Sequence, residues 1–185
     1  MPKRNAAVLE VLNKAFDESE GKTVDLVIDH GDLKGISLKM LEWWYVHPHD
    51  TVIYNMWHPR DHFSFEWVIP PGENKKIRYM LHATEAVGEF PASVLCIRGE
   101  DPEKSPVTPT LKCFDWSSVL GKDDKPIALI FHEHEATPGG VKMRSVFRFP
   151  SKTPNKFINA MRKHSEAEMV NLQKILPSLY EQYAK

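Results

Sequence analysis

The 185-residue sequence lacks the features that mark several special classes of protein. Its only cysteines, Cys96 and Cys113, lack the CxxC spacing of a zinc ribbon or redox motif. We expect both to be reduced thiols, although their pairing in one disulfide stays open. No apolar run reaches the roughly 20 residues of a membrane span, and the polar start MPKRNAAVLEVLNK has no signal-peptide core. These absences predict a cytoplasmic protein.

An excess of charge of one sign is also missing. The 24 basic and 25 acidic residues leave a net charge of -1. This balance gives no electrostatic basis for binding nucleic acid or an anionic membrane. The length suits one domain with a real core, here residues 1–185, and leaves a homodimer open. Within that domain we assign 1–36 to an N-terminal helix and lead-in, 37–150 to a short helix and antiparallel sheet, and 151–185 to a C-terminal helix.

The sequence is rich in proline, with 14 residues, of which twelve, from Pro48 to Pro154, divide its middle into short segments. Short β-branched and aromatic segments between Pro, Gly or charged turns are typical of strands. We predict seven strands, at residues 51–57, 62–69, 76–90, 92–99, 110–116, 127–135 and 141–149. TPGG, between the last two, indicates a tight hairpin, and residues 99–109 an exposed loop.

Helical patterns flank the strands. Apolar residues at helical spacing predict an amphipathic helix over 4–19 and a long one from Lys156 to about Lys174, with a last turn starting at Pro177. A short helix begins after Ser37 as N-cap and ends before Pro48. We therefore predict an α+β fold in which a curved antiparallel sheet wraps around the long C-terminal helix, with a cavity between them.

The terminal helix carries the most informative polar pair. His164 and Glu168 lie one turn apart on the same stripe as Phe157, Met161 and Leu172. A buried carboxylate needs a partner, because burying it alone costs several kcal/mol or shifts its pKa. Two such inward groups can hold a divalent metal. The alternatives are a hydrogen-bonded His–Glu pair at the core edge, or a stripe rotated toward solvent.

Two strands place further polar groups on sheet faces. Glu85 shares a strand face with apolar neighbours, whereas Glu89 is close to Pro91 and the turn and is expected to be exposed. By itself Glu85 is better explained as an edge-strand charge. His132 and His134 share the other predicted strand's polar end, which either lines a wet cavity or is half exposed.

The segment NMWHPRDHF places two histidines four residues apart. Pro59 argues against an ordinary helix across His58 and His62, so the two rings should have different roles. We expect one ring to face the cavity and the other to pack. Asp61 is suited to orient a ring nitrogen.

Taken in order, five segments resemble the diacetylphloroglucinol hydrolase family, which includes phloretin hydrolases. They span residues 37 to 183 and read LEWWYVHP, YNMWHPRDH, HATEAVG, GGVKMRSVFRF and RKHSEAEMVNLQKILPSLY. The resemblance implies a helix-grip fold of the Bet v 1-like type. It also implies one zinc ion bound by two histidines and two glutamates, and hydrolysis of the carbon–carbon bond between an acyl group and a phenolic ring.

The resemblance further implies roles for residues of this chain. The zinc ligands would be His62, Glu85, His164 and Glu168. Tyr54, eight residues before His62, matches a tyrosine that contacts substrate, and His132 matches a cavity histidine, the candidate acid or base. Phe147 stands where some relatives have a second tyrosine, and Phe65 where diacetylphloroglucinol hydrolase has an asparagine.

The expected substrate is a small aromatic ketone, with walls from Trp57 and the other tryptophans Trp43, Trp44 and Trp67. Plain core packing is the alternative for each tryptophan. Two other functions stay open. One is a non-catalytic helix-grip protein that binds an aromatic or polyketide ligand, and the other is a metal-dependent isomerase, cyclase or lyase acting on a polyketide.

Overall fold

The computed structural model describes residues 6–47, 50–72 and 78–184. Short 3₁₀ turns cover Pro102–Lys104 and Lys122–Asp124. The helices and strands are, in chain order, α1 (Val8–Glu18), β1 (Thr23–Lys34), α2 (Leu38–Val46), α3 (Thr51–Trp57), β2 (His62–Ile69), β3 (Tyr79–Val87), β4 (Phe90–Gly99), β5 (Cys113–Leu120), β6 (Pro126–Thr137), β7 (Gly140–Pro150) and α4 (Asn155–Tyr183).

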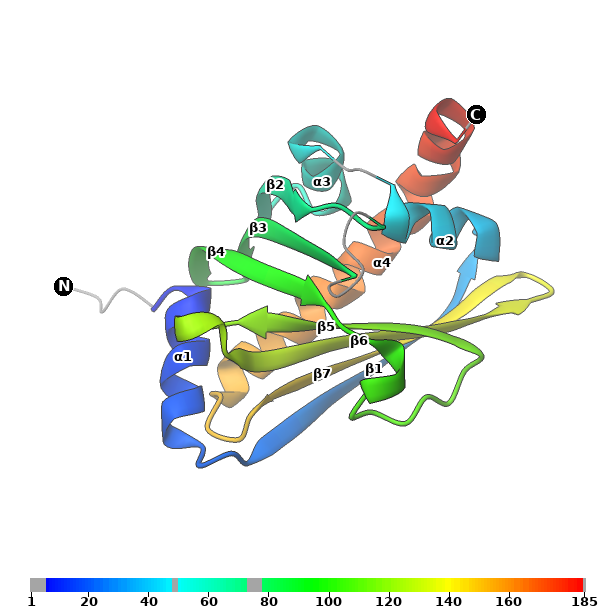
Figure 1. The fold of residues 1–185 in the computed structure, drawn as a ribbon. Helices are drawn as coiled ribbons and strands as arrows, with labels where there is room; N and C mark the ends of the chain where they lie inside the picture. Colours follow the sequence, from blue (N-terminus) through cyan, green and yellow to red (C-terminus); the bar gives the residue numbers. More distant parts are fainter. Residues whose placement is uncertain (1–5, 48–49, 73–77, 185) are drawn as a thin grey trace.

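One curved sheet holds all these strands in the order β1-β7-β6-β5-β4-β3-β2, and every neighbouring pair is antiparallel. The sheet curves around α4, which crosses one face, while α1 covers one end and α2 and α3 lie toward the other (Figure 1). The predicted α+β helix-grip architecture is therefore confirmed. No helix in the described part of the chain is both long and apolar enough to cross a membrane.

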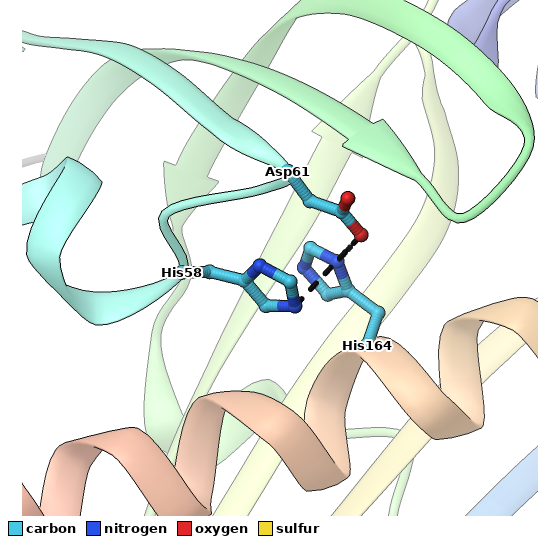
Figure 2. A group of neighbouring side chains, drawn as sticks. All are labelled: His58, Asp61 and His164. Atoms are coloured by element: carbon cyan, nitrogen blue, oxygen red, sulfur yellow. Dashed lines mark hydrogen bonds and ion pairs between the residues drawn. The ribbon is translucent and has the colours of Figure 1, made fainter.

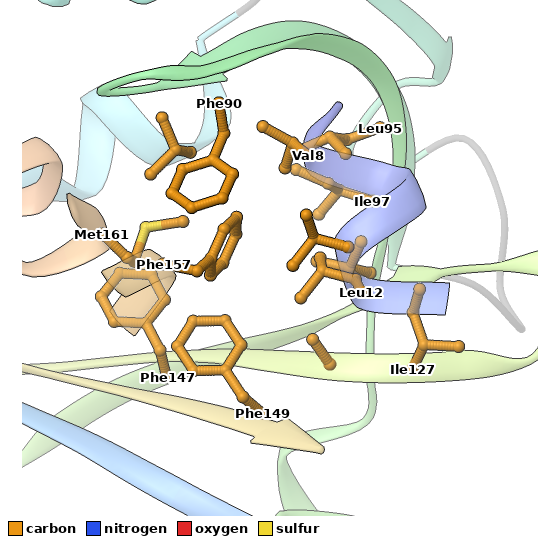
Figure 3. Close-up of a cluster of buried hydrophobic side chains, with 14 of the residues drawn as sticks. Val8, Leu12, Phe90, Leu95, Ile97, Ile127, Phe147, Phe149, Phe157 and Met161 are labelled. Atoms are coloured by element: carbon orange, nitrogen blue, oxygen red, sulfur yellow. The ribbon is translucent and has the colours of Figure 1, made fainter. Parts of the chain in front are cut away.

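Two apolar clusters pack along α4. The first joins α1 and the sheet to the start of α4, and Figure 3 shows Val8 and Leu12 of α1 gathered with phenylalanines of β7 and α4. The second joins α2, α3 and β7 to the far half of α4, around Leu172 and Leu176. His164 and Glu168 lie between the two clusters along the helix. The buried stripe of α4 thus turns polar only in its middle.

Local capping explains why residues 51–57 form a helix. We predicted a strand there from the β-branched and aromatic residues, and that prediction was wrong. Asp50 caps α3, because its Oδ1 accepts a hydrogen bond from the Ile53 N–H at 2.8 Å. Ile53 and Tyr54 are then buried on one face while Val52 is exposed. In this segment, burial of side chains at helical spacing outweighs the strand propensity of the β-branched and aromatic residues.

Two further predictions need correction. The strand β1 was assigned to the lead-in, because its aspartates and glycine hide the alternation of Leu26 and Ile28, which are buried under α4 and α1. α4 continues through Pro177 to Tyr183 instead of ending near Lys174. Burial of Leu176 and Leu179 on both sides of Pro177 offsets the lost backbone hydrogen bond.

The remaining boundaries agree with prediction to within a few residues. Ser37 caps α2, as predicted, with its Oγ accepting from the Met40 N–H at 3.2 Å. The TPGG turn joins β6 and β7, and a Cβ on Gly140 would clash with the Leu33 carbonyl oxygen of β1. Cys96 and Cys113 are free thiols. Residues 4–5, Pro48 and residues 76–77 of predicted elements lie outside the described residues.

Candidate metal centre and cavity

His62, the first residue of β2, is held rigidly with one ring nitrogen free for a ligand. Its ring is fully buried and stacks on Tyr54 at a centroid distance of 4.0 Å, with the edge of Trp57 at 5.1 Å. Nδ1 lies 3.2 Å from the Tyr54 carbonyl oxygen, so Nδ1–H can donate there. Nε2 is buried and makes no hydrogen bond to the described part of the chain. This tautomer leaves the Nε2 lone pair free for a metal.

His164 and Glu168 project inward from α4, as their spacing predicted, and lie beside His62. Nε2 of His62 and Nε2 of His164 lie 3.2 and 3.6 Å from Oε1 of Glu168. Nδ1 of His164 hydrogen-bonds Oδ2 of Asp61 at 3.0 Å, a contact drawn in Figure 2. A carboxylate on the far ring nitrogen is the usual support of a metal-binding histidine. The sequence predicted that Asp61 orients a ring nitrogen, but it did not indicate which histidine.

The register of the sheet brings Glu85 near this group, although among the described residues the ligand atoms of the group that lie within 4.8 Å of one another come from His62, His164 and Glu168 alone. His62 and Glu85 are directly opposite on β2 and β3, so their side chains project from neighbouring points of one face. The Tyr54 hydroxyl donates a hydrogen bond to Oε1 of Glu85, and Glu85 lines the same cavity as His164. Glu89 instead forms an ion pair with Lys156 at 2.6 Å and is about half exposed. The geometry therefore favours Glu85 over Glu89 as the strand carboxylate.

The electrostatics of the group favour a cation. Burial opposes a charge on His164, but the carboxylates of Glu168 and Asp61 outweigh it and raise the pKa of His164 well above its ordinary value. Burial likewise opposes a charge on Glu168, yet the charged ring of His164 holds the pKa of Glu168 far below its usual range. The buried site thus retains a negative charge that either a proton on His164 or a metal ion compensates.

A second group of possible ligands shares His164. His58, Asp61 and His164 also offer ligand atoms close together (Figure 2). His58 Nε2 is 3.8 Å from Oδ2 of Asp61, and its ring stacks on His164 at 4.5 Å. A metal there would take the His164 Nδ1 that Asp61 already holds. The donor set of His62, Glu85, His164 and Glu168 fits zinc better, since it presents two neutral nitrogens and two anionic oxygens.

The predicted site residues surround a single cavity between the sheet and α4. Eight of them line it, and His62, which does not, contacts the lining residue Glu168. The eight are Tyr54, Trp57, Phe65, Glu85, His132, Phe147, His164 and Glu168. Trp44 and Trp67 also line the cavity, whereas Trp43 packs its ring against Tyr180 at 5.5 Å. Aromatic walls of this kind suit a flat, apolar ring with few polar contacts.

His132 faces the cavity as a neutral ring. Burial lowers its pKa to about 4, in spite of the opposing effect of Glu168. Phe147 lies edge-on to it at 6.0 Å, and Tyr45 of α2 stacks parallel to it at 6.2 Å. An imidazolium at this position is therefore scarce near neutral pH, and any proton that His132 donates must come from the neutral ring.

The cavity has a second polar end, which was not predicted from the sequence. Asp115 of β5 lies directly opposite His132 of β6. It accepts hydrogen bonds from the Tyr79 hydroxyl at 3.2 Å and from Arg78, while burial raises its pKa. Tyr79 shares a strand face with Glu85, a signal present in the sequence. Nothing local to residues 110–116 indicated that Asp115 faces the cavity, because that depends on strand register.

A family model described as DAPG hydrolase PhiG domain matches residues 21–157. The chain belongs to this family. The match contains His62, Glu85 and His132 and ends before His164. The assignment of His164 and Glu168 of α4 to the site therefore rests on their spacing and on the geometry of the structure. Membership in the DAPG hydrolase family points to a hydrolase. A comparison with curated proteins gives no significant match.

Solved structures agree with the fold. Ara h 8.0201 is 14% identical, with a TM-score of 0.58 over 85% of this chain and 99% of that one. A protein from Nitrosomonas europaea is 12% identical, with a TM-score of 0.57 over 88% of this chain and 97% of that one. At these identities the likeness concerns fold alone. The DAPG hydrolase family member described here thus has a Bet v 1-like fold.

Proposed function

We propose that this protein is a zinc-dependent hydrolase that cleaves the carbon–carbon bond between an acyl group and a phenolic, phloroglucinol-like ring. The observation that carries the proposal is the approach of His62, His164 and Glu168 to one another, with Glu85 opposite His62, at an aromatic cavity. Family membership supports the hydrolytic chemistry. The substrate we propose is a small aromatic ketone.

Four side chains would hold the zinc ion, namely His62, Glu85, His164 and Glu168. When bound, zinc would polarise the ketone and lower the pKa of water at the site. The protein positions these ligands before metal arrives, since the Tyr54 carbonyl and Asp61 fix both histidine rings and the Tyr54 hydroxyl holds Glu85. Such prior ordering reduces the entropy lost on binding.

The cavity residues would bind and orient the ketone. Its ring would lie between aromatic walls that include Trp57, Phe65 and Phe147, and the Tyr54 hydroxyl would contact an acyl or ring oxygen. Phe65 and Phe147 offer no hydrogen bond to a ring hydroxyl. Asp115 and Tyr79, at the other polar end, are the groups we propose for that contact. His132 would serve as the acid or base that moves protons at the scissile bond.

The reaction balances as one ketone and one water giving a carboxylic acid and the deacylated phenol. A purified sample should contain about one zinc ion per chain. Incubated with 2,4-diacetylphloroglucinol in water labelled with heavy oxygen, it should release acetic acid that carries solvent oxygen. His164→Ala and Glu168→Ala should lose both metal and turnover. Glu181→Ala, an exposed position on the same helix, should keep both and is the matched control.

Other results would redirect the proposal. Full metal content in both His164→Ala and Glu168→Ala would mean that α4 does not bind the ion. Products without solvent oxygen would indicate an isomerase, cyclase or lyase. Tight binding of the ketone by a metal-free protein, with no product, would indicate a binding protein. Wild-type turnover in His132→Ala would remove that residue from the acid–base role.

A further inference from the structure

A buried serine hydroxyl connects the cavity histidine to a second histidine at the edge of the sheet. Oγ of Ser145 lies 2.8 Å from Nδ1 of His132 and 2.9 Å from Nε2 of His30. Ser145 is fully buried, whereas His30 is partly exposed. The three side chains therefore form a continuous hydrogen-bonded path from the edge strand to the cavity wall.

The register of three strands builds this path. On β7, Ser145 stands directly opposite His132 of β6 and Ile28 of β1. The pairing of β1 shifts between Asp29 and Gly31, so His30 is an extra, bulged residue. Gly31 has a φ of +66°, a conformation that favours glycine. A β-bulge re-aims the side chain it carries, and here His30 reaches the Ser145 hydroxyl.

The hydrogen atoms on the path allow two complete arrangements. A hydroxyl donates one hydrogen and accepts others. In the first arrangement His30 Nε2–H donates to Ser145, Ser145 donates to His132 Nδ1, and His132 carries its proton on Nε2. In the second, His132 Nδ1–H donates to Ser145, Ser145 donates to His30 Nε2, and His30 carries its proton on Nδ1. Since Ser145 occupies Nδ1, Nε2 is the His132 nitrogen left for substrate.

We propose that His30, Ser145 and His132 form a proton relay between solvent and the cavity, which keeps His132 neutral through the catalytic cycle. This inference rests on the proposed hydrolysis. As water adds to the ketone carbon, its proton moves to His132 Nε2. The Nδ1 proton then passes to Ser145, the hydroxyl proton to His30 Nε2, and the Nδ1 proton of His30 to solvent. The second arrangement has become the first.

The same path runs backward when the carbon–carbon bond breaks. The ring carbon keeps the bonding electron pair and takes the proton from His132 Nε2. Ser145 then gives its proton to His132 Nδ1, His30 gives its Nε2 proton to Ser145, and solvent returns a proton to His30 Nδ1. The second arrangement is restored, so each turnover closes the cycle with no net change in the relay.

The surroundings of His132 explain why a relay is useful. Burial keeps the pKa of this ring near 4, so holding the proton as an imidazolium would be unfavourable near neutral pH. Burial lowers the pKa of His30 as well, against the opposing effects of Glu168, Glu166 and Asp29, but this ring is partly exposed. The proton thus leaves the path at the edge of the sheet, where water can accept it.

The kinetic test compares three substitutions on the zinc-loaded enzyme with diacetylphloroglucinol as substrate. Ser145→Ala should lower kcat roughly 10- to 100-fold, less than the roughly 100- to 10,000-fold contribution of a general acid or base because His132 itself remains. KM should change less than about threefold, and zinc content should stay unchanged. His30→Ala should show a similar loss, which added imidazole restores in a saturable way. Ser118→Ala, an equally buried serine outside the cavity lining, should behave like wild type.

Imidazole should not rescue Ser145→Ala, because the middle of the path is missing. Wild type in the same imidazole concentrations corrects for inhibition at the metal. Loss of activity in His30→Ala that imidazole leaves unchanged would overturn the relay, as would wild-type kcat in Ser145→Ala. A purely structural role of Ser145 would raise KM or lower zinc content, which also contradicts the proposal.

A measurement without substrate separates this inference from the proposed function. Nitrogen-15 NMR of the imidazole rings reports which ring nitrogen carries the proton. The relay requires His30 and His132 to carry it on the same nitrogen, both Nε2 or both Nδ1. If His132 is protonated on Nδ1 while His30 is protonated on Nε2, both rings donate to Ser145 and no ring nitrogen can accept its proton. That result would overturn the relay. Matched rings in a protein that hydrolyses no acylphloroglucinol would instead refute the proposed function alone.

Discussion

Replacement of Asp61 by asparagine offers the sharpest test of how the metal centre is built. The Asp61 carboxylate accepts the Nδ1–H of His164 at 3.0 Å, and its side chain is only 14% exposed. Its backbone carbonyl accepts a separate hydrogen bond from the Ala86 N–H at 2.8 Å. The substitution therefore removes the negative charge behind His164 while keeping the turn.

The expected loss follows from that single contact. A hydrogen bond to a charged group contributes about 1.5–3 kcal/mol. Loss of the carboxylate behind a metal-binding histidine typically weakens metal affinity by about 10- to 100-fold, or roughly 1.4–2.8 kcal/mol. The two estimates agree. Asp61→Asn should thus bind zinc about 10- to 100-fold more weakly, with the same stoichiometry.

The assay is competition for zinc between the stripped protein and a chromophoric chelator of known affinity. Glu89→Gln is the matched control, because this carboxylate lies just after β3, beside the Gly88 whose N–H contacts Asp61, but pairs with Lys156. His58→Gln separates the two possible ligand groups and should change affinity only a few-fold. Asp61→Asn within twofold of wild type would refute the supporting role. Loss of zinc in both Asp61→Asn and His58→Gln would move the ion to the His58–Asp61–His164 group.

Four further predictions concern proton release, pH-dependent stability, substrate contact and the fold. Zinc binding at pH 7 should release about one proton per ion, because the raised pKa of His164 keeps that ring charged in the metal-free protein. Calorimetry in buffers of different ionisation enthalpy measures this release. Release of no proton would refute the charge assigned to His164. The same raised pKa means that charged His164 contributes its full stabilisation of the folded state below pH about 6.5. This stabilisation is lost as pH rises through the folded-state pKa. The metal-free protein should therefore unfold more easily in alkaline solution. Tyr54→Phe should reduce kcat about tenfold while zinc content is retained, since one hydrogen bond near the reacting group is lost; an unchanged kcat would exclude the hydroxyl from the reaction. Pro177→Ala should raise the free energy of unfolding in urea by about 1–2 kcal/mol, because alanine restores a helical N–H in α4; a decrease would mean that the helix depends on its proline.

The sequence by itself determined the architecture and half of the proposed metal site. Periodicity along one element is a local property, so the apolar stripe of α4 placed His164 and Glu168 inward without any knowledge of the sheet. The alternation along residues 79–87 likewise placed Tyr79 and Glu85 on one face. Local signals failed at residues 51–57, where strand-forming side chains follow a helix cap at Asp50.

Only the tertiary structure decided which of these residues meet. The pairing of His62 with Glu85, of Asp115 with His132, and of His132 with Ser145 depends on strand register. A shift of one residue would send each side chain to the other face, and no local pattern encodes that alignment. The bulge that directs His30 to Ser145 is also a product of pairing between distant strands. Composition and spacing thus supplied the ligand types and the helix face, and the packed sheet brought them together.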